Sequence, residues 1–396
     1  MVQSPQAGLT LRVGLVAGEA SGDTLGARLI EALRESVPAV QCAGIAGPKM
    51  AAAGCEAWHW AEELAVMGLV EVVPHLPRLM ALRRDIERRL IHWQPDVFVG
   101  VDAKEFNLSL SRRLRAAGLL TVQYVSPQVW AWRPGRVRRM HEAVDLVLCL
   151  LPFEKQFYDR QGLQAEFVGH PLADAIPLQP DRDAARAELG LPAEATIIAL
   201  LPGSRRGEIT RLTPDAAAVA RCLRARRPEV LLVAPMASPA ARRTFEALWR
   251  QHAPDLPVQV VEGAAQRVLI AANAAFVASG TATLEAALCK RPMVVVYRLD
   301  ALSAWVIRRF NLVKSAFFAQ PNLLAGRRVV GEYFQEQIDP AHIADEILGW
   351  LEDDARRAEL ERIFLDIHLQ LRQDASRRAA AAILALVAAR RAAANA

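Results

Sequence analysis

Short apolar runs rich in β-branched residues alternate with longer stretches of helical periodicity along most of this chain of 396 residues. Each run is followed by Gly, Ser or Pro and then by a helix-like stretch, which is typical of parallel βα units. The chain is therefore predicted to fold as α/β with parallel sheets. The predicted strands are residues 11–17, 96–101, 119–125, 145–150, 196–201, 230–234, 258–261, 275–278 and 293–297.

The predicted strands fall into two sets, separated by a Pro-rich segment at residues 170–180. At about 150 residues per domain, a chain of 396 residues is too long for one core. We therefore expect two Rossmann-like, doubly wound domains, at residues 1–175 and 176–345. Beyond residue 345, Arg, Glu, Ala and Leu alternate at helical spacing, so residues 346–396 are predicted to form a helical C-terminal tail.

Charge and composition exclude several classes of protein. The chain carries 48 Lys and Arg against 43 Asp and Glu, and its formal net charge of +5 is too small an excess to indicate a nucleic-acid partner. Its 5 cysteines are scattered without a CxxC pair, which favours a reducing compartment over a disulfide framework. No apolar run reaches the roughly 18 to 20 residues that span a bilayer, and the first residues do not resemble a secretory leader. We expect a cytoplasmic chain that does not cross the membrane.

Two loops of the second half place small residues directly after predicted strands, and one of the two adds an arginine. They are Gly203, Ser204 and Arg205 in one loop and Ser279, Gly280 and Thr281 in the other. Small residues let backbone N–H donors at a helix start approach a phosphate, and Arg205 adds a fixed charge. Glu285, about one turn into the next helix, is placed to accept hydrogen bonds from ribose hydroxyls. A nucleotide diphosphate is predicted here, with ligand-free turns and helix caps as the alternative.

Acidic residues follow two predicted strands of the first half. The loop after the opening strand carries Glu19, Ser21 and Gly22, and lacks the spacing of a dinucleotide fingerprint. Because Glu19 would repel a pyrophosphate, this loop suits a hydroxyl-rich ligand. Asp102 follows another strand, where a carboxylate can act as a general base. A turn with a helix cap and an ordinary surface carboxylate are the respective alternatives.

Residues 66–82 form an apolar stretch with a fringe of arginines between Arg78 and Arg89. An apolar face beside a cationic one is typical of a segment that lies in a membrane interface. A core helix with a solvated basic face fits the same pattern, and a substrate with acyl chains would favour the membrane. The predicted membrane-contact residues are Val70, Val73, Leu76, Leu79 and Met80.

No metal or cofactor site is predicted. Asp181-Arg182-Asp183 matches the DxD pattern with which some glycosyltransferases hold a divalent cation. Because it opens an Ala-rich helical stretch, we interpret it as a helix cap. The 8 histidines are dispersed without ligand spacing.

Taken together, the loops resemble those of the lipid-A-disaccharide synthases, glycosyltransferases of lipopolysaccharide assembly. The matching segments lie in the family's order between about residues 13 and 330, which makes the resemblance far more specific than any single loop. They are VAGEASGD at 16–23, GIAGP at 44–48, YVSPQVWAW at 124–132, LPFE at 151–154, LPGSR at 201–205, ASGTATLE at 278–285 and PNLLAGR at 321–327.

The resemblance implies a GT-B-type enzyme, with two Rossmann-like domains facing a cleft and UDP held mainly by the second. It implies UDP-2,3-diacylglucosamine as donor and 2,3-diacylglucosamine 1-phosphate as acceptor. An inverting transfer would give the β(1→6)-linked disaccharide 1-phosphate and UDP. It also implies peripheral association with the cytoplasmic face of the inner membrane, and a homodimer that exchanges C-terminal segments.

By similarity to the family, Asp102 is the predicted base, and Glu19 and Asn322 line the cleft. One departure concerns the segment after Asp102, where the family pattern DAPDFN is replaced by DAKEFN. Glu105 keeps the negative charge at a longer reach, so its role stays open. The alternative function is another GT-B enzyme with a UDP-N-acetylglucosamine-type donor, either an epimerase or a peptidoglycan glycosyltransferase. A scaffold that keeps the fold without catalysis is a further alternative.

Overall fold

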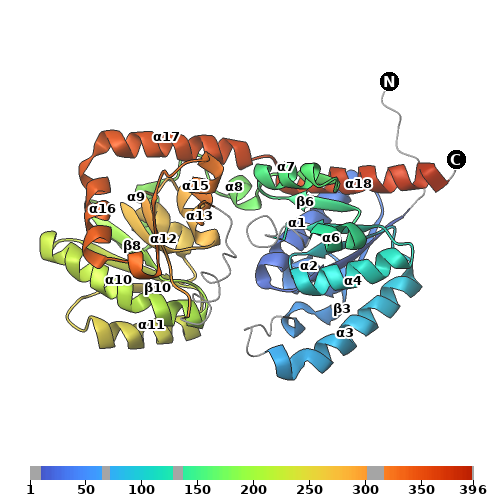
Figure 1. Cartoon of the computed structure of the whole chain (residues 1–396), viewed down its shortest axis with the longest axis horizontal. Helices are drawn as coiled ribbons and strands as arrows, with labels where there is room; N and C mark the ends of the chain where they lie inside the picture. Colours follow the sequence, from blue (N-terminus) through green and yellow to red (C-terminus); the bar gives the residue numbers. More distant parts are fainter. Residues whose placement is uncertain (1–9, 65–71, 128–136, 301–315, 395–396) are drawn as a thin grey trace. The chain divides into compact units, whose positions relative to one another are not determined.

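The structure is a computed structural model that describes residues 10–64, 72–127, 137–300 and 316–394 (Figure 1). The chain forms two compact units. The first unit comprises Met1–Asp174 and Leu371–Ala396, and the second comprises Ala175–Gln370. Each unit contains its own parallel sheet, which confirms the predicted pair of Rossmann-like α/β domains.

The sheet of the first unit has seven strands in the order β3-β2-β1-β4-β5-β6-β7. The predicted strands of this half are confirmed as β1, β4, β5 and β6, whereas β2, β3 and β7 were not predicted. Two of the unpredicted strands, β3 and β7, are the sheet edges and are partly exposed, so they lack a continuous apolar run. The bounds are β1 Leu11–Ala17, β2 Val40–Ala46, β3 Cys55–Trp60, β4 Val97–Val101, β5 Thr121–Tyr124, β6 Leu146–Cys149 and β7 Ala165–Phe167.

The sheet of the second unit has six strands in the order β10-β9-β8-β11-β12-β13, again all parallel. The predicted strands of this half are confirmed, and β13 is additional. The bounds are β8 Ile197–Leu201, β9 Leu231–Met236, β10 Gln259–Glu262, β11 Ala274–Ala278, β12 Met293–Tyr297 and β13 Gly331–Phe334.

Helices follow the strands, as expected for βα units. In the first unit they are α1 Ala20–Ser36, α2 Pro48–Ala52, α3 Val72–Trp93, α4 Lys104–Ala116, α6 Val137–Ala143, α7 Pro152–Arg160, α8 Pro171–Ala175 and α18 Ala375–Ala394. In the second they are α9 Arg182–Glu188, α10 Arg206–Arg226, α11 Pro239–His252, α12 Ala265–Ala271, α13 Thr281–Leu288, α15 Gln320–Ala325, α16 Pro340–Glu352 and α17 Asp354–Leu371. No helix of the described segments is long and apolar enough to cross a bilayer.

The C-terminal helices are divided between the two units, where the sequence pattern suggested one block at residues 346–396. Ile343 and Ile347 of α16 are fully buried in the core of the second unit. Ile383 and Val387 of α18 are buried in the core of the first unit, against Leu29 and other residues of α1. The apolar face of each helix therefore decides the unit to which it belongs.

The strand order of both sheets reverses once, beside the first strand of each. In the first unit β1 lies between β2 and β4, and in the second β8 lies between β9 and β11. At such a point the loops leave the sheet toward opposite faces, which opens a crevice at the carboxyl ends of the strands. Functional residues are therefore expected in the loops after β1, β4, β8 and β11.

The packing of α18 predicts a stability effect. Ile383→Ala should destabilise the protein by roughly 2–4 kcal/mol, because Ile383 is fully buried against the first sheet's core. Urea unfolding measures the change. Ala388→Ser, at an exposed position of the same helix, is the control and should change stability by less than about 0.5 kcal/mol. Equal effects of the two substitutions would contradict the docking of α18 on this core.

Candidate functional site

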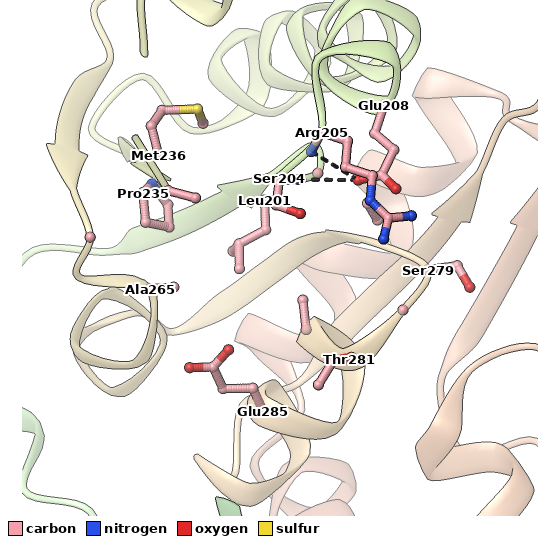
Figure 2. Close-up of a pocket in the computed structure, with 16 residues that line it drawn as sticks. Leu201, Ser204, Arg205, Glu208, Pro235, Met236, Ala265, Ser279, Thr281 and Glu285 are labelled. Atoms are coloured by element: carbon pink, nitrogen blue, oxygen red, sulfur yellow. Dashed lines mark hydrogen bonds between the residues drawn. The ribbon is translucent and has the colours of Figure 1, made fainter. Parts of the chain in front are cut away.

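A cavity of about 520 Å³ opens at the strand reversal of the second unit (Figure 2). Its walls come from the loops after β8, β9 and β11, the segment around Gly263, and the first turns of α12 and α13. The size is that of a small-molecule site. The residues predicted from the two phosphate loops all line it: Gly203, Ser204, Arg205, Ser279, Gly280, Thr281 and Glu285.

The start of α13 presents a positive end to this cavity. Gly280 precedes the helix with φ +144°, a conformation that few residues other than glycine adopt. The first turn of α13 carries no acidic residue, and Thr283 closes the turn by donating its hydroxyl to the Gly280 carbonyl, 2.8 Å away. The backbone N–H groups of this turn therefore meet the cavity with the helix dipole behind them.

The loop after β8 differs from the prediction. The Glu208 carboxylate accepts the backbone N–H groups of Ser204 and Arg205, at 3.1 and 3.3 Å. These donors, which were expected to meet a phosphate, are therefore already engaged. Gly203 permits the contact, since at φ +122° an added Cβ would come within 2.4 Å of the Glu208 Cβ. Glu208 was not singled out from the sequence, although an acid three residues after a cap is a recognisable capping signal.

The positive charge of this loop comes instead from the Arg205 side chain. Arg205 is exposed, and in Figure 2 its guanidinium extends toward the side of the cavity where Ser279 lies. A guanidinium offers a planar fork of donors that matches phosphate oxygens. The cavity therefore combines a fixed cation with the start of α13.

Glu285 gives the cavity a second, different end. Its carboxylate points into the space near Ala265, on the side away from Ser279 (Figure 2). The side chain is half-buried, and this burial raises the pKa of Glu285 above its ordinary value. A desolvated carboxylate is a strong acceptor for hydroxyl groups. The cavity thus has an end suited to phosphates and an end suited to hydroxyls.

Asn322 lies outside this cavity and is fully buried. Its amide nitrogen donates to the Val330 carbonyl and to Glu332, at 3.0 and 2.8 Å, and its amide oxygen accepts from Val329 and Val330. Glu332 in turn accepts the N–H groups of Phe318 and Ala319. These bonds give Asn322 a structural role, which holds the segment before β13 against α15.

In the first unit, the loops after β1 and β4 lie against each other. A Cβ added at Gly18 would come within 2.6 Å of the Ala103 Cβ, and one at Gly22 within 3.4 Å of the Val101 carbonyl oxygen. Glycine is therefore required at Gly18 for this approach. Glu19 is the exposed N-cap residue of α1, and Ser21 is also exposed. The structure thus brings Glu19 and Asp102 to the same edge of one sheet.

Asp23, in the same loop, has a structural partner. It is buried, and its carboxylate accepts the backbone N–H groups of Lys49 and Met50 at 3.0 and 2.9 Å. These are the first N–H groups of α2, so Asp23 caps that helix. Both of its carboxylate oxygens are therefore engaged by the fold.

Asp102 is held in an unusual conformation. Its φ is +52° and that of Ala103 is +38°, both in the left-handed region. The Asp102 carbonyl accepts two buried side-chain amides, from Asn107 at 3.0 Å and Gln123 at 3.1 Å. These bonds offset the strain, and strained backbone of this kind is concentrated at functional sites. Gln123 carries no signal in the sequence that would have marked it, whereas Asn107 is the last residue of the DAKEFN segment compared with the family pattern.

The half-buried carboxylate of Asp102 accepts no hydrogen bond from any residue within the described segments. Glu105, in the first turn of α4, is exposed. The carboxylate of Asp102 is therefore available to a substrate, whereas its main chain is fixed by the fold.

The predicted membrane-contact residues are only partly described. Val70 and the side chains of Val73 and Leu76 lie outside the described residues. Leu79 is half-buried against the core below α3, and Met80 is 40% exposed. The arginine fringe is partly neutralised, because Arg78 pairs with Glu63, and Arg88 and Arg89 pair with Asp85.

Comparison with known proteins decides the family. A family model described as Lipid-A-disaccharide synthetase matches residues 13–387. The lipid-A-disaccharide synthase of Serratia proteamaculans is 49% identical over 95% of this chain and 98% of its own length. That of Yersinia pseudotuberculosis is 48% identical over 97% of each chain. The chain belongs to the lipid-A-disaccharide synthase family.

Solved structures with little sequence identity share the fold. The calicheamicin glycosyltransferase CalG4 matches with a TM-score of 0.55 at 18% identity, over 95% of this chain and 98% of its own. The trehalose 6-phosphate synthase of Burkholderia multivorans matches with a TM-score of 0.60 at 13% identity, over 98% and 99%. These likenesses confirm the GT-B-type fold of this lipid-A-disaccharide synthase family member.

In this family member the DxD pattern is used as a helix cap. The Asp181 side chain accepts the backbone N–H of Ala184 at 2.9 Å, at the start of α9. Within the described segments, no group of three or more His, Cys, Asp or Glu side chains is arranged to hold a metal ion.

The Glu285 carboxylate should lower the stability of the fold and strengthen the binding of UDP. Burial raises the pKa of Glu285 in the folded protein. Ionisation of this carboxylate therefore lowers the free energy of unfolding at pH values above the ordinary carboxylate pKa. Glu285→Gln should therefore match or exceed the wild-type thermal stability at pH 7, and the difference should shrink as the pH falls toward 4. The same substitution should weaken UDP binding at least tenfold, since it removes a charged acceptor. Calorimetry of unfolding and of UDP binding measures both effects.

Glu246→Gln is the control for this substitution, because Glu246 lies on α11 in an ion pair with Arg242. It should leave UDP binding unchanged. A Glu285→Gln protein that is less stable at pH 7 and binds UDP normally would show that the Glu285 carboxylate serves only the fold.

Proposed function

We propose that this chain transfers the sugar of UDP-2,3-diacylglucosamine to 2,3-diacylglucosamine 1-phosphate, with release of UDP. The product would be the β(1→6)-linked disaccharide 1-phosphate, formed with inversion at the anomeric carbon. The observation that carries the proposal is the two-ended cavity of the second unit, in a chain of the lipid-A-disaccharide synthase family.

The donor would bind along this cavity. Its diphosphate meets the start of α13 at Gly280 and Thr281 together with Arg205, and its ribose hydroxyls meet Glu285. The uracil ring then faces the apolar wall at Pro235 and Met236. As the bond to the sugar breaks, negative charge grows on the departing UDP. The Arg205 cation and the dipole of α13 are aimed at that charge, which is how a preorganised site lowers a barrier.

The acceptor hydroxyl would be activated by Asp102. The carboxylate accepts the proton of the 6-hydroxyl as its oxygen attacks the anomeric carbon, and the bond from that carbon to the UDP oxygen breaks. The left-handed main chain at Asp102 and its bonds from Asn107 and Gln123 fix the direction of the base. Glu19, the N-cap residue of α1 in the neighbouring loop, would bind sugar hydroxyls beside it.

The test incubates purified protein with both lipid precursors in detergent and follows disaccharide 1-phosphate and UDP by mass spectrometry. The wild-type protein should form both products in equal amounts. Asp102→Asn should keep wild-type affinity for UDP and lose at least about a hundredfold in turnover, because it removes the base and leaves the second unit untouched. Near-normal turnover by Asp102→Asn would refute its role as base.

Asp159→Asn is the matched control, since Asp159 is an α7 carboxylate paired with Lys155. It should leave turnover unchanged. A parallel incubation with UDP-N-acetylglucosamine in place of the diacyl donor addresses donor choice. Conversion of that soluble sugar nucleotide, with none of the diacyl form, would favour another GT-B activity and overturn the proposed one.

We also propose that the enzyme reaches its lipids from the cytoplasmic face of the inner membrane, through the apolar segment 66–82. Support comes from the acyl chains of the proposed substrates and from Met80, an exposed residue of this segment. We further propose a homodimer that exchanges C-terminal segments. In such a dimer the contact between α1 and α18, made here within one chain, would form between two chains.

Replacing Val70, Val73 and Leu76 together with Ser should weaken binding to anionic vesicles, measured by co-sedimentation, by at least tenfold while the thermal transition is kept. The control replaces Leu365 and Leu369, exposed apolar residues of α17, with Ser. The control should bind vesicles like the wild type. Unchanged vesicle binding by the triple variant would refute the membrane role, and loss of its fold would identify a core segment.

A further inference from the structure

The second unit has another pocket, which lies at the amino ends of its parallel strands. The pocket has a volume of about 160 Å³, and its lining includes the residues just before three strands: Thr196 before β8, Asn273 before β11 and Pro292 before β12. Because these strands are parallel, their amino ends lie together and so do their carboxyl ends. The cavity of Figure 2 lies at the carboxyl ends, so the two sites are at opposite ends of the strands.

The lining of this pocket is rich in hydrogen-bond donors. Four arginines from different elements take part: Arg182 of α9, Arg227 at the end of α10, Arg291 after α13 and Arg357 of α17. Glu361 is the single carboxylate among the described residues that line it, and it is exposed. The pocket therefore carries an excess of positive charge.

Two of the arginines have partners of their own. Arg227 pairs with Glu352 at 2.9 Å and with Glu229 at 3.6 Å. Arg357 donates to the carbonyls of Trp350 and Leu351, both at 2.8 Å, and pairs with Asp354. These bonds join the ends of α10, α16 and α17, so both side chains are accounted for by the fold.

The other two arginines are not paired within the described chain. Within the described segments, neither the Arg182 nor the Arg291 side chain makes an ion pair or a hydrogen bond. The Nε of Arg291 is buried without a hydrogen-bond partner. An arginine that is both desolvated and unpaired is unusual, because burial of a charge is unfavourable unless a counter-charge accompanies it.

The electrostatic surroundings of Arg291 agree with this picture. Burial lowers the pKa of Arg291 below its ordinary value, Cys289 and Glu361 oppose this shift, and the positive charges of Arg182 and Arg186 add to it. Arg186 is not a member of the pocket lining, since its guanidinium donates to the Ala271 carbonyl and to the Asn273 amide oxygen.

Asn273 adds a neutral donor. Its amide oxygen accepts from Arg186 and from the Ile197 N–H, both at 2.9 Å. This arrangement assigns the opposite side of the amide to nitrogen, which donates to no described residue, and Asn273 is among the residues that line the pocket. Donors from Arg182, Arg291 and Asn273 thus converge on one small space with few acceptors.

We propose that this pocket binds an oxyanion of phosphate size, held by Arg291 and Arg182 with Asn273. One guanidinium group can donate two parallel hydrogen bonds to the oxygens of a phosphate. The volume of the pocket is well below the roughly 300 Å³ at which ordinary small-molecule sites begin. The ligand is therefore a single phosphate group, either free inorganic phosphate or a phosphate monoester of a lipid headgroup. The site is separate from the donor cavity and does not depend on the function proposed above.

The test uses thermal unfolding of the full chain in inorganic phosphate, with sodium chloride at the same ionic strength as reference. Without phosphate, Arg291→Met should unfold at the wild-type temperature or above it, since the substitution removes an unpaired charge and keeps an apolar stem. Phosphate should then raise the unfolding temperature of the wild type with the logarithm of its concentration. The variant should lose this response, with an affinity for phosphate at least tenfold weaker.

Two further variants keep the test decisive. Arg182→Gln, at an exposed position, should lose most of the phosphate response without affecting the fold. Arg243→Met, an exposed arginine of α11 outside the pocket, should respond like the wild type. Vesicles with a phosphate-monoester lipid form a second arm. A response to vesicles that depends on Arg291 and is absent with inorganic phosphate would assign the headgroup as the source.

Several outcomes would overturn the site. One is a phosphate response of equal size in wild type, Arg291→Met and Arg182→Gln, and another is no response in either arm. A response that sets in only at tens of millimolar phosphate would mean an adventitious ion only. An Arg291→Met protein that unfolds well below the wild type in the absence of phosphate would show that Arg291 already has its counter-charge within the chain.

Discussion

The single reversal of strand order in each sheet is the constraint on which both candidate sites depend. Between β8 and β11, the loops that leave the sheet diverge, and the space between them is filled neither by main chain nor by large side chains. Between β1 and β4, the equivalent loops stay in contact because Gly18 lets Ala103 approach. The same topology thus gives an open cavity in one unit and a tightly packed pair of loops in the other.

The two units also control charge in different ways. At the cavity of the second unit, the Glu208 carboxylate accepts the backbone N–H groups of the loop after β8, and the Arg205 side chain supplies the positive charge of that loop. At Asp102 the main chain is strained and its carbonyl is bound by buried amides, while the carboxylate has no hydrogen-bond partner among the described residues. In both cases internal hydrogen bonds hold the main chain of the loop and leave one side chain available.

Much of this could be predicted from the sequence, because parallel sheets and their loops are encoded locally. Buried strands such as β4 and β11 are continuous apolar runs, and small residues follow them directly. Edge strands such as β3 were missed, since a half-exposed strand has no such run. The structural roles of Asn322 and Asp23 were missed because their partners lie in other elements, and the sequence pattern does not show which polar side chains meet. For the same reason Asn107 and Gln123 were found only from their contacts.

The return of α18 to the first unit has a consequence for synthesis of the protein. The core that contains β1 also contains Ile383 and Val387, which lie near the opposite end of the chain. During translation, residues 1–174 of the first unit therefore leave the ribosome before the whole second unit is made. The core of the first unit cannot be completed until α18 has also emerged. The second unit, which is continuous in sequence, has no such delay. The half of the enzyme that is made first is thus the half that finishes folding last, and it is the half that most needs protection in the meantime.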